Sequence, residues 1–192
     1  MLYPNLKFRT PKNRPFFYTN FVQTLDGKVA VKGDGYWPIG SKTDHEVMVE
    51  LRAHADALIH GKNLYKEFGN ITAENLKKAS FRSLRAKLGR NPDLPYYQAT
   101  HNLKKLVQEL KNKGYKNVLI EGGPTLLGSF LKEGLLDEIF ITIAPKIYGT
   151  KEGQTLTLVE GYLFPKNSTK KLSLISVKAI KDELFLHYKV GN

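Results

Sequence analysis

The chain has 192 residues, of which 41% are hydrophobic and 11% aromatic, which is enough to bury the core of one α/β domain over residues 1–192. It contains no cysteine, which excludes disulfide bonds, thiolate nucleophiles and zinc–cysteine clusters and fits a reducing compartment. The formal net charge of +12 attracts anions, such as a phosphorylated cofactor, a phosphorylated substrate or nucleic acid.

The first residues, up to Phe17, carry basic residues between prolines and lack the apolar stretch of a signal peptide. No apolar run approaches the ~20 residues that a transmembrane helix needs. We therefore expect a cytoplasmic protein that does not contact a membrane.

The first third of the chain predicts two strands with a helix between them. Aromatic and β-branched residues up to Leu25 are typical of a central strand, which stops at the turn pair Asp26-Gly27. Ser41 and Thr43 can each cap a helix whose apolar residues recur at helical spacing. The expected elements are a strand over 16–25, a glycine-rich loop over 31–40, a helix over 43–54 and a buried strand over 56–60.

Between residues 62 and 95, basic residues are scattered among weakly periodic apolar ones. This stretch predicts a loop, a basic helix around 73–87 and a second loop. Strands that alternate with helices and end in a hairpin predict an α/β fold, with a mostly parallel sheet, helices on both faces and an antiparallel edge. The later elements are expected as a strand over 94–100, a helix over 102–113, a strand over 117–120, a helix to about 132, a strand over 138–144 and a hairpin over 171–190.

The strongest local signal is residues 118–126, a buried strand that turns sharply into a helix. Gly122 and Gly123 let the backbone approach a ligand, and Pro124 suits the first helical position. The free N–H groups of the next turn, with the Thr125 hydroxyl, can form a phosphate cradle. By itself the motif favours a tight turn with no ligand, because it has neither the Rossmann nor the Walker spacing.

Several motifs follow one another along residues 16 to 150, most of the chain. They are Thr24-Leu25-Asp26-Gly27-Lys28-Val29-Ala30, Leu51-Arg52-Ala53 with Asp56-Ala57 and Gly61, Glu121-Gly122-Gly123-Pro124-Thr125-Leu126, Glu133-Gly134-Leu135-Leu136-Asp137-Glu138, and Ile143-Ala144-Pro145-Lys146-Ile147-Tyr148-Gly149. In this order the motifs resemble the reductase domain of riboflavin biosynthesis. The chain is therefore similar to the RibD C-terminal domain and to the archaeal-type 5-amino-6-(5-phosphoribosylamino)uracil reductases.

The resemblance implies a dihydrofolate-reductase-like three-layer αβα sandwich, NADPH as hydride donor and a homodimer. In this family the ribosyl group of a phosphoribosylamino-pyrimidine is reduced to a ribityl group. Asn20 stands where archaeal and fungal-type reductases have Asn and many bacterial ones have Lys. With the lack of a deaminase domain in these residues, Asn20 predicts the stand-alone type of reductase.

The resemblance also implies the site residues. Asn20 and Glu121 are the catalytic candidates, and Trp37, Ser41 and Arg52 join them around the substrate. No metal site is expected, and a cis peptide at Gly122–Gly123, which is frequent in dihydrofolate-reductase-like folds, would support ligand binding there. The expected cofactor-binding residues are Gly61 beside the nicotinamide, Asn63, Leu64, Thr100 near the adenosine 2′-phosphate, and Gly122, Gly123, Pro124, Thr125 and Leu126 at the pyrophosphate.

Several of these residues have a structural interpretation as well. We expect Asp26 to cap a turn, and Lys28 to bind phosphate or to be solvated. Arg52 can clamp a phosphate or anchor its helix. Function is favoured for Glu121, because it follows a buried strand and must be partnered or face a cleft. The histidines His54, His60 and His101 lack metal-ligand spacing and are interpreted as structural.

One segment departs from the family pattern. The family usually has Gly-x-x-Thr followed by an acidic-acidic-Pro segment, whereas residues 61–64 read Gly-Lys-Asn-Leu and no acidic-Pro pair follows. A pterin, a folate or another carbonyl or imine compound is therefore the alternative substrate. A second alternative is an RNA-binding module built on the basic segment 66–90. That segment has few aromatic residues for base stacking, so no nucleic-acid partner is expected.

Overall fold

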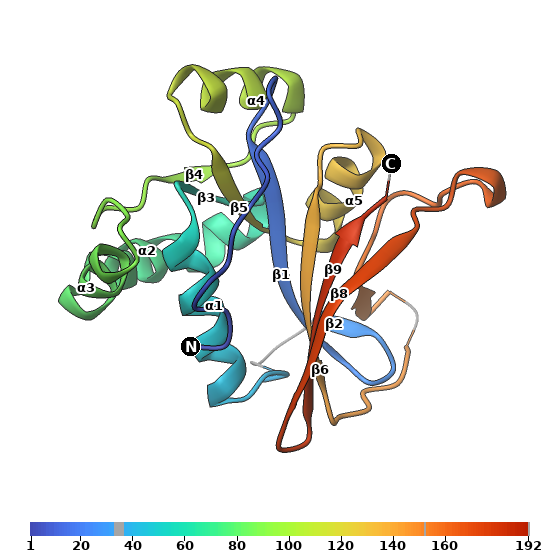
Figure 1. Cartoon of the computed structure of the whole chain (residues 1–192). Coiled ribbons are helices and arrows are strands. Elements are labelled where there is room, and N and C mark those ends of the chain that lie inside the picture. Colours follow the sequence, from blue (N-terminus) through green and yellow to red (C-terminus); the bar gives the residue numbers. More distant parts are fainter. Residues whose placement is uncertain (33–36, 152, 192) are drawn as a thin grey trace. The chain divides into compact units, whose positions relative to one another are not determined.

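The computed structural model describes residues 1–32, 37–151 and 153–191. Within these residues the chain forms two compact units, whose helices and strands are labelled in Figure 1. Unit 1 consists of Met1–Tyr18 and Glu46–Gly123, and unit 2 of Thr19–His45 and Pro124–Asn192. The boundary falls inside the first strand and inside the first helix, so each unit contains part of both elements.

Unit 1 contains the start of β1 (Phe16–Thr24), β3 (Ala57–His60), β4 (Tyr96–Gln98) and β5 (Asn117–Glu121). Their order is β4-β3-β5-β1, and β3 is parallel to β4 and to β5. All residues of β3 and β5 are buried, because both strands consist mostly of apolar side chains. His60 ends β3 in register with Gln98 of β4 and Glu121 of β5, which brings three polar residues to one edge of this sheet.

The helices of unit 1 are most of α1 (Lys42–His54), α2 (Lys62–Lys77), α3 (Ala79–Lys87) and α4 (Leu103–Asn112). The predicted helices over 43–54 and 102–113 are confirmed as α1 and α4. Asn102 caps α4, because its Oδ1 accepts the N–H of Lys105 at 3.0 Å. The buried side of α4 carries Leu103, Leu106 and Leu110 at helical spacing.

The prediction for residues 62–95 is partly wrong. A helix begins at Lys62 rather than near residue 73, and extended backbone at Lys78 separates α2 from α3. A hydrophobic pattern does not show the start of α2, because small and polar residues carry most of its buried side. The buried residues of α2 are Gly69, Thr72 and Leu76.

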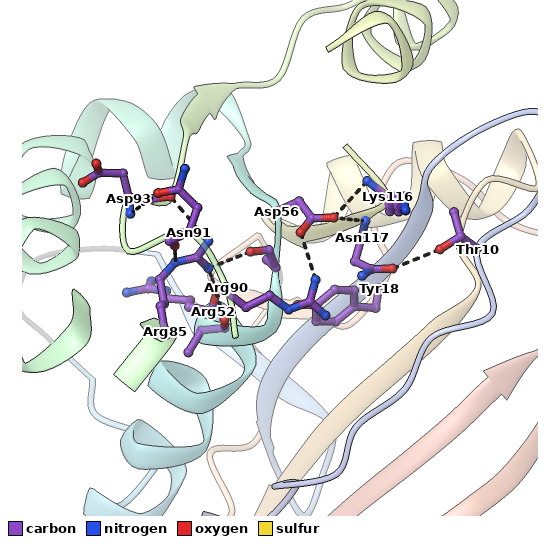
Figure 2. A network of polar contacts seen from close by, with 12 residues as sticks. Thr10, Tyr18, Arg52, Asp56, Arg85, Arg90, Asn91, Asp93, Lys116 and Asn117 are labelled. Atoms are coloured by element: carbon purple, nitrogen blue, oxygen red, sulfur yellow. Dashed lines mark hydrogen bonds and ion pairs between the residues drawn. The ribbon is translucent and has the colours of Figure 1, made fainter. Parts of the chain in front are cut away.

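Arg85 of α3 is buried and holds the carboxyl end of α1. Its Nη1 donates to the carbonyl oxygens of Ala53 at 3.1 Å and Ala55 at 2.6 Å, and its Nε donates to Asn91 O at 2.6 Å. Figure 2 shows these bonds leaving one guanidinium toward two segments of unit 1. Arg85 thus satisfies carbonyl groups that the end of a helix leaves without intrahelical partners.

Asp56, between α1 and β3, connects two further segments of unit 1. Its Oδ1 accepts from Nη1 of Arg90 at 3.0 Å, and its Oδ2 accepts the N–H groups of Lys116 and Asn117, each at 2.9 Å (Figure 2). Because the carboxylate takes several donors at once, it fixes the start of β5 beside the start of β3.

Unit 2 contains the rest of β1 with β6 (Glu138–Ala144), β9 (Glu183–Val190) and β8 (Leu172–Ile180), in the order β1-β6-β9-β8. The pairs β6–β9 and β8–β9 are antiparallel, which confirms the predicted hairpin over 171–190. The helix over residues 124–132 is confirmed as α5 (Pro124–Lys132), and η1 (Lys166–Ser168) is a short 3-10 turn.

A second, two-stranded sheet in unit 2 was not predicted. It pairs β2 (Lys28–Val31) with β7 (Thr155–Thr157) in antiparallel orientation. Both strands are too short to show a pattern, and their partners lie far apart in the sequence. Part of the predicted glycine-rich loop, residues 33–36 with Tyr36, lies outside the described residues.

In the part of the chain that the structure describes, no helix is long and apolar enough to cross a membrane.

Candidate functional site

Glu121, the last residue of β5, forms a buried ion pair with Arg52 of α1. Arg52 donates from Nε to Oε1 at 2.8 Å and from Nη2 to Oε2 at 2.5 Å. Each side chain is less than one tenth exposed. Two parallel bonds between a guanidinium and a carboxylate fix the plane of both groups, so Arg52 anchors α1 to the end of β5.

His60, the last residue of β3, completes this cluster. Its Nε2 lies 3.0 Å from Oε2 of Glu121, and its Nδ1 lies 2.7 Å from the hydroxyl of Tyr96 on β4. The rings of Tyr65 and Tyr96 lie 5.0 Å apart beside it. We refer to Arg52, His60, Tyr96 and Glu121 as the edge cluster.

The sequence contained a signal for His60 that was not used. Both β3 and β5 are buried strands that end in one polar residue followed by glycine, as His60-Gly61 and Glu121-Gly122. Because the two strands are parallel and in register, these polar residues become neighbours. The interpretation of His60 as structural, and the omission of Tyr96, left this cluster unrecognised.

Electrostatics keep Glu121 ionised. Burial raises the pKa of Glu121, but the charge of Arg52 and the hydrogen bond from His60 outweigh burial and hold that pKa at about 2. The pKa of Arg52 is raised, because the charge of Glu121 outweighs the effect of burial. At neutral pH Glu121 is therefore a hydrogen-bond acceptor and has no proton to donate.

The other cofactor residues predicted in unit 1 lie on three segments. Gly61 is buried at the first position before α2, with extended φ and ψ of −64° and 157°. Asn63 and Leu64 lie in the first turn of α2, where a loop was predicted. Thr100 is exposed, and its hydroxyl donates to Asn102 O at 3.2 Å. Their contact with a cofactor stays a prediction.

Gly122 and Gly123 end unit 1, and Pro124 begins α5 as predicted. A Cβ at Gly123 would meet no heavy atom within 4 Å, so the backbone there is open to an approaching group. Thr125 is exposed in the first turn of α5, followed by the half-buried Leu126. The expectation of a cis peptide is not met: no peptide bond is cis among the described residues, and Gly122–Gly123 is trans.

Three predicted substrate residues lie in unit 2. Asn20 on β1 is half-buried, and its Oδ1 is a buried atom that has no hydrogen-bond partner among residues 1–32, 37–151 and 153–191. The only tryptophan, Trp37, is 51% exposed and packs edge-on against Tyr148 at 5.4 Å. Ser41 Oγ accepts the N–H of Thr43 at 3.0 Å and donates to Glu183. Ser41 therefore caps α1, and its hydroxyl is occupied within unit 2.

The turn interpretation of Asp26 is confirmed. Its carboxylate accepts from the Thr24 hydroxyl at 2.6 Å and from the N–H groups of Tyr148 and Gly149 at 3.2 and 2.8 Å. Of the two alternatives for Lys28, solvation is wrong, because this residue is only 8% exposed, and phosphate binding stays a prediction. No group of three or more His, Asp or Glu side chains is arranged to hold a metal among the residues described.

Comparison with known proteins places the chain in a family. The sequence model of the family described as RibD C-terminal domain matches residues 70–186, more than half of the chain. The chain belongs to the RibD C-terminal domain family. The matched residues include all of β4 and β5 and therefore Tyr96 and Glu121 of the edge cluster.

Two curated relatives illustrate the two kinds of member. The riboflavin biosynthesis protein RibD of Aquifex aeolicus is 31% identical over 72% of this chain, and the match covers 48% of that protein. The chain thus spans about half the length of this relative. The 2,5-diamino-6-ribosylamino-4(3H)-pyrimidinone 5′-phosphate reductase of Methanothermobacter thermautotrophicus is 25% identical over 92% of this chain, and the match covers 99% of that enzyme.

Solved structures confirm the fold. A pyrimidine reductase-like protein from Corynebacterium diphtheriae matches with a TM-score of 0.69 at 20% identity, over 93% of this chain and 92% of that one. Dihydrofolate reductase from Enterococcus faecalis matches with a TM-score of 0.55 at 14% identity, over 92% of this chain and 97% of that one. The predicted dihydrofolate-reductase-like α/β fold is confirmed.

Proposed function

We propose that this chain reduces the ribosyl group of a phosphoribosylamino-pyrimidine to a ribityl group, with NADPH as the hydride donor. The observation that carries the proposal is the buried, ionised Glu121 at the end of β5, directly before Gly122-Gly123, in a member of the RibD C-terminal domain family. Asn20 and the match along 99% of an archaeal reductase favour the substrate named for that enzyme, a diamino-ribosylamino-pyrimidinone 5′-phosphate.

The residues at the start of α5 fit a dinucleotide. The open backbone at Gly123, the exposed Thr125 and the free N–H groups of a helix start suit a diphosphate. We assign Gly122, Gly123, Pro124, Thr125 and Leu126 to that group, and Gly61, Asn63, Leu64 and Thr100 to the rest of the cofactor. When bound, NADPH supplies the hydride, and the protein supplies position and exclusion of water.

Glu121 acts as an acceptor in this proposal. Because its pKa is about 2, Glu121 is ionised at neutral pH and can orient a substrate hydroxyl. The same ionisation removes Glu121 as a source of the proton that the reduction consumes. Asn20 offers a buried carbonyl oxygen without a partner, which can hold a donor such as water or a substrate N–H group. We therefore assign the proton to a water molecule.

The test is substrate-dependent oxidation of NADPH, followed by absorbance. We expect turnover with the pyrimidine ribosylamine phosphate and none with dihydrofolate. The shift of the melting temperature with NADPH and with NADH, each at about 1 mM, measures cofactor binding independently of turnover. Turnover of dihydrofolate alone would move the assignment to the pterin alternative, and no shift with either dinucleotide would remove the reductase assignment.

We also propose that the protein is a homodimer that pairs through β8. This strand is at the edge of its sheet, and Leu174 and Val177 on it are more than half exposed. An exposed edge strand with apolar side chains is a template for another strand, and antiparallel pairing with its own copy satisfies two-fold symmetry. Val177→Lys should convert the dimer to a monomer in light scattering, whereas a monomeric wild-type protein would contradict the proposal.

RNA binding is the less favoured function. In the basic segment, Arg82, Arg85 and Arg90 are each bonded within unit 1, to Asp93, to carbonyl groups and to Asp56. These three arginines of the basic segment therefore already have hydrogen-bond partners within the protein. We propose a single cytoplasmic reductase domain over residues 1–192 without a nucleic-acid partner. Binding of RNA with an affinity that falls steeply as the salt concentration rises would contradict the absence of that partner.

A further inference from the structure

His60 is a buried ionisable side chain that has no role in the reaction proposed above. It is 1% exposed and lies at the same sheet edge as Glu121. A buried histidine with hydrogen bonds on both ring nitrogens has a fixed ring orientation.

The partners of the ring decide which nitrogen carries the hydrogen. An ionised carboxylate only accepts, so Nε2 of His60 must donate to Oε2 of Glu121. In the neutral ring Nδ1 is then an acceptor, and the Tyr96 hydroxyl donates to it at 2.7 Å. Burial raises the pKa of Tyr96 to about 12, so this hydroxyl keeps its hydrogen. The donors run in one direction, from Tyr96 through His60 to Glu121.

The two oxygens of Glu121 are not equivalent. Oε2 accepts from Nη2 of Arg52 and from Nε2 of His60, whereas Oε1 accepts, within the part of the chain that the structure describes, from Nε of Arg52 alone. A carboxylate oxygen has two lone-pair sites. Oε2 is therefore filled, and Oε1 retains one site for a further donor.

We propose that His60 is a positioning residue that fills Oε2 of Glu121 and so directs the substrate hydroxyl to Oε1. This role rests on the proposed reduction. Without His60, Oε2 would keep a free lone-pair site as well, and either oxygen could take the hydroxyl. Tyr96 acts one step further out, because it holds the ring in the tautomer that donates to Glu121.

A second buried histidine–carboxylate pair provides the control. In unit 2, Nε2 of His187 lies 2.8 Å from Oε2 of Glu138, and the ring stacks on Phe140 at 3.9 Å between centroids. His187 is 5% exposed, so replacing it removes a comparable buried contact. This pair lies on the antiparallel strands β6 and β9, and neither residue is among those predicted to bind ligands.

The experiment compares His60→Leu, His60→Gln and His187→Leu in the full chain, with urea unfolding, kcat and KM for each. His60→Leu should lower kcat about tenfold to a hundredfold, as expected for a misplaced reacting group, and leave KM for NADPH unchanged. His60→Gln should keep most of kcat, because its amide N–H can still donate to Oε2. His187→Leu should lose similar stability and keep kcat.

Two results would overturn the positioning role. One is a kcat of His60→Leu equal to that of His187→Leu, which would make His60 a packing residue. The other is a ring ¹⁵N spectrum of the wild type without ligand that shows the hydrogen on Nδ1 rather than Nε2. The spectrum needs no turnover. If the wild type is inactive but shows the Nε2–H tautomer, the proposed reduction is contradicted. The hydrogen bonds from Tyr96 through His60 to Glu121 would then stand, and only their role in catalysis would be lost.

Discussion

The Nη1 atom of Arg85 lies 2.6 Å from the carbonyl oxygen of Ala55, just past the carboxyl end of α1. The same guanidinium reaches Asn91, after the end of α3, so one buried side chain joins two helix ends. A buried cation without a carboxylate partner is costly unless its N–H groups are all used. Here peptide carbonyl groups use them, and burial lowers the pKa of Arg85 to about 10.

Replacing Arg85 should destabilise the protein strongly. Arg85→Met keeps most of the side-chain volume but leaves buried carbonyl oxygens without donors, which should cost about 3 kcal/mol of unfolding free energy. Urea unfolding measures the loss. The matched control is Lys87→Met on the same helix, where the side chain is exposed and the change should stay within about 0.5 kcal/mol. Equal effects of the two substitutions would contradict the capping role.

The ionisation of Glu121 should appear in the acid stability of the protein. Its folded-state pKa of about 2 lies below the ordinary value of 4.5, so its contribution is complete above pH 4.5 and is lost as the pH falls toward 2. Glu121→Gln should be less stable than wild type at pH 7 by a few kcal/mol, and the difference should shrink between pH 4.5 and 2. Urea unfolding across this range is the measurement, and a difference independent of pH would contradict it.

Asp44 should show the opposite dependence on pH. Burial, and then the charge of Glu183, raise the pKa of Asp44 above its ordinary 3.8. Its Oδ1 is a buried atom for which the described residues provide no hydrogen-bond partner. Folding therefore favours the protonated acid, and the ionised form costs stability once the pH rises above about 4. Asp44→Asn should gain stability relative to wild type as the pH rises from 4 to 7, by about 1 kcal/mol. Glu133→Gln, an exposed change of equal charge in unit 2, should show no such trend.

Trp37 offers an optical test of the predicted substrate residues. It is the only tryptophan and is 51% exposed, so its fluorescence reports contact with a flat ring directly. The pyrimidine ribosylamine phosphate should change the emission and bind about tenfold more weakly to Trp37→Phe. NADPH affinity should be equal in the two proteins. Unchanged emission at saturating substrate would remove Trp37 from the substrate site.

Much of the fold follows from local patterns. A buried strand is predicted by the apolar run at Val118–Ile120. An amphipathic helix is predicted by the helical spacing of Leu103, Leu106 and Leu110. The start of α2 did not follow, because its buried positions hold residues such as Gly69 and Thr72 that carry no hydrophobic signal. The β2–β7 pair did not follow either, because short strands reveal their partners only in space.

The sequence by itself determined the family, the α/β fold, Glu121 as a residue that needs a partner, and Asp26 as a turn residue. Only the tertiary structure decided that Arg52 and His60 are the partners of Glu121, that Tyr96 lies behind His60, and that Arg85 is buried. The physical reason is the sequence separation between the residues that interact. Turns, caps and periodicity are set by neighbours in the chain, whereas ion pairs and tautomers are set by strand register and helix packing, which join residues distant in sequence.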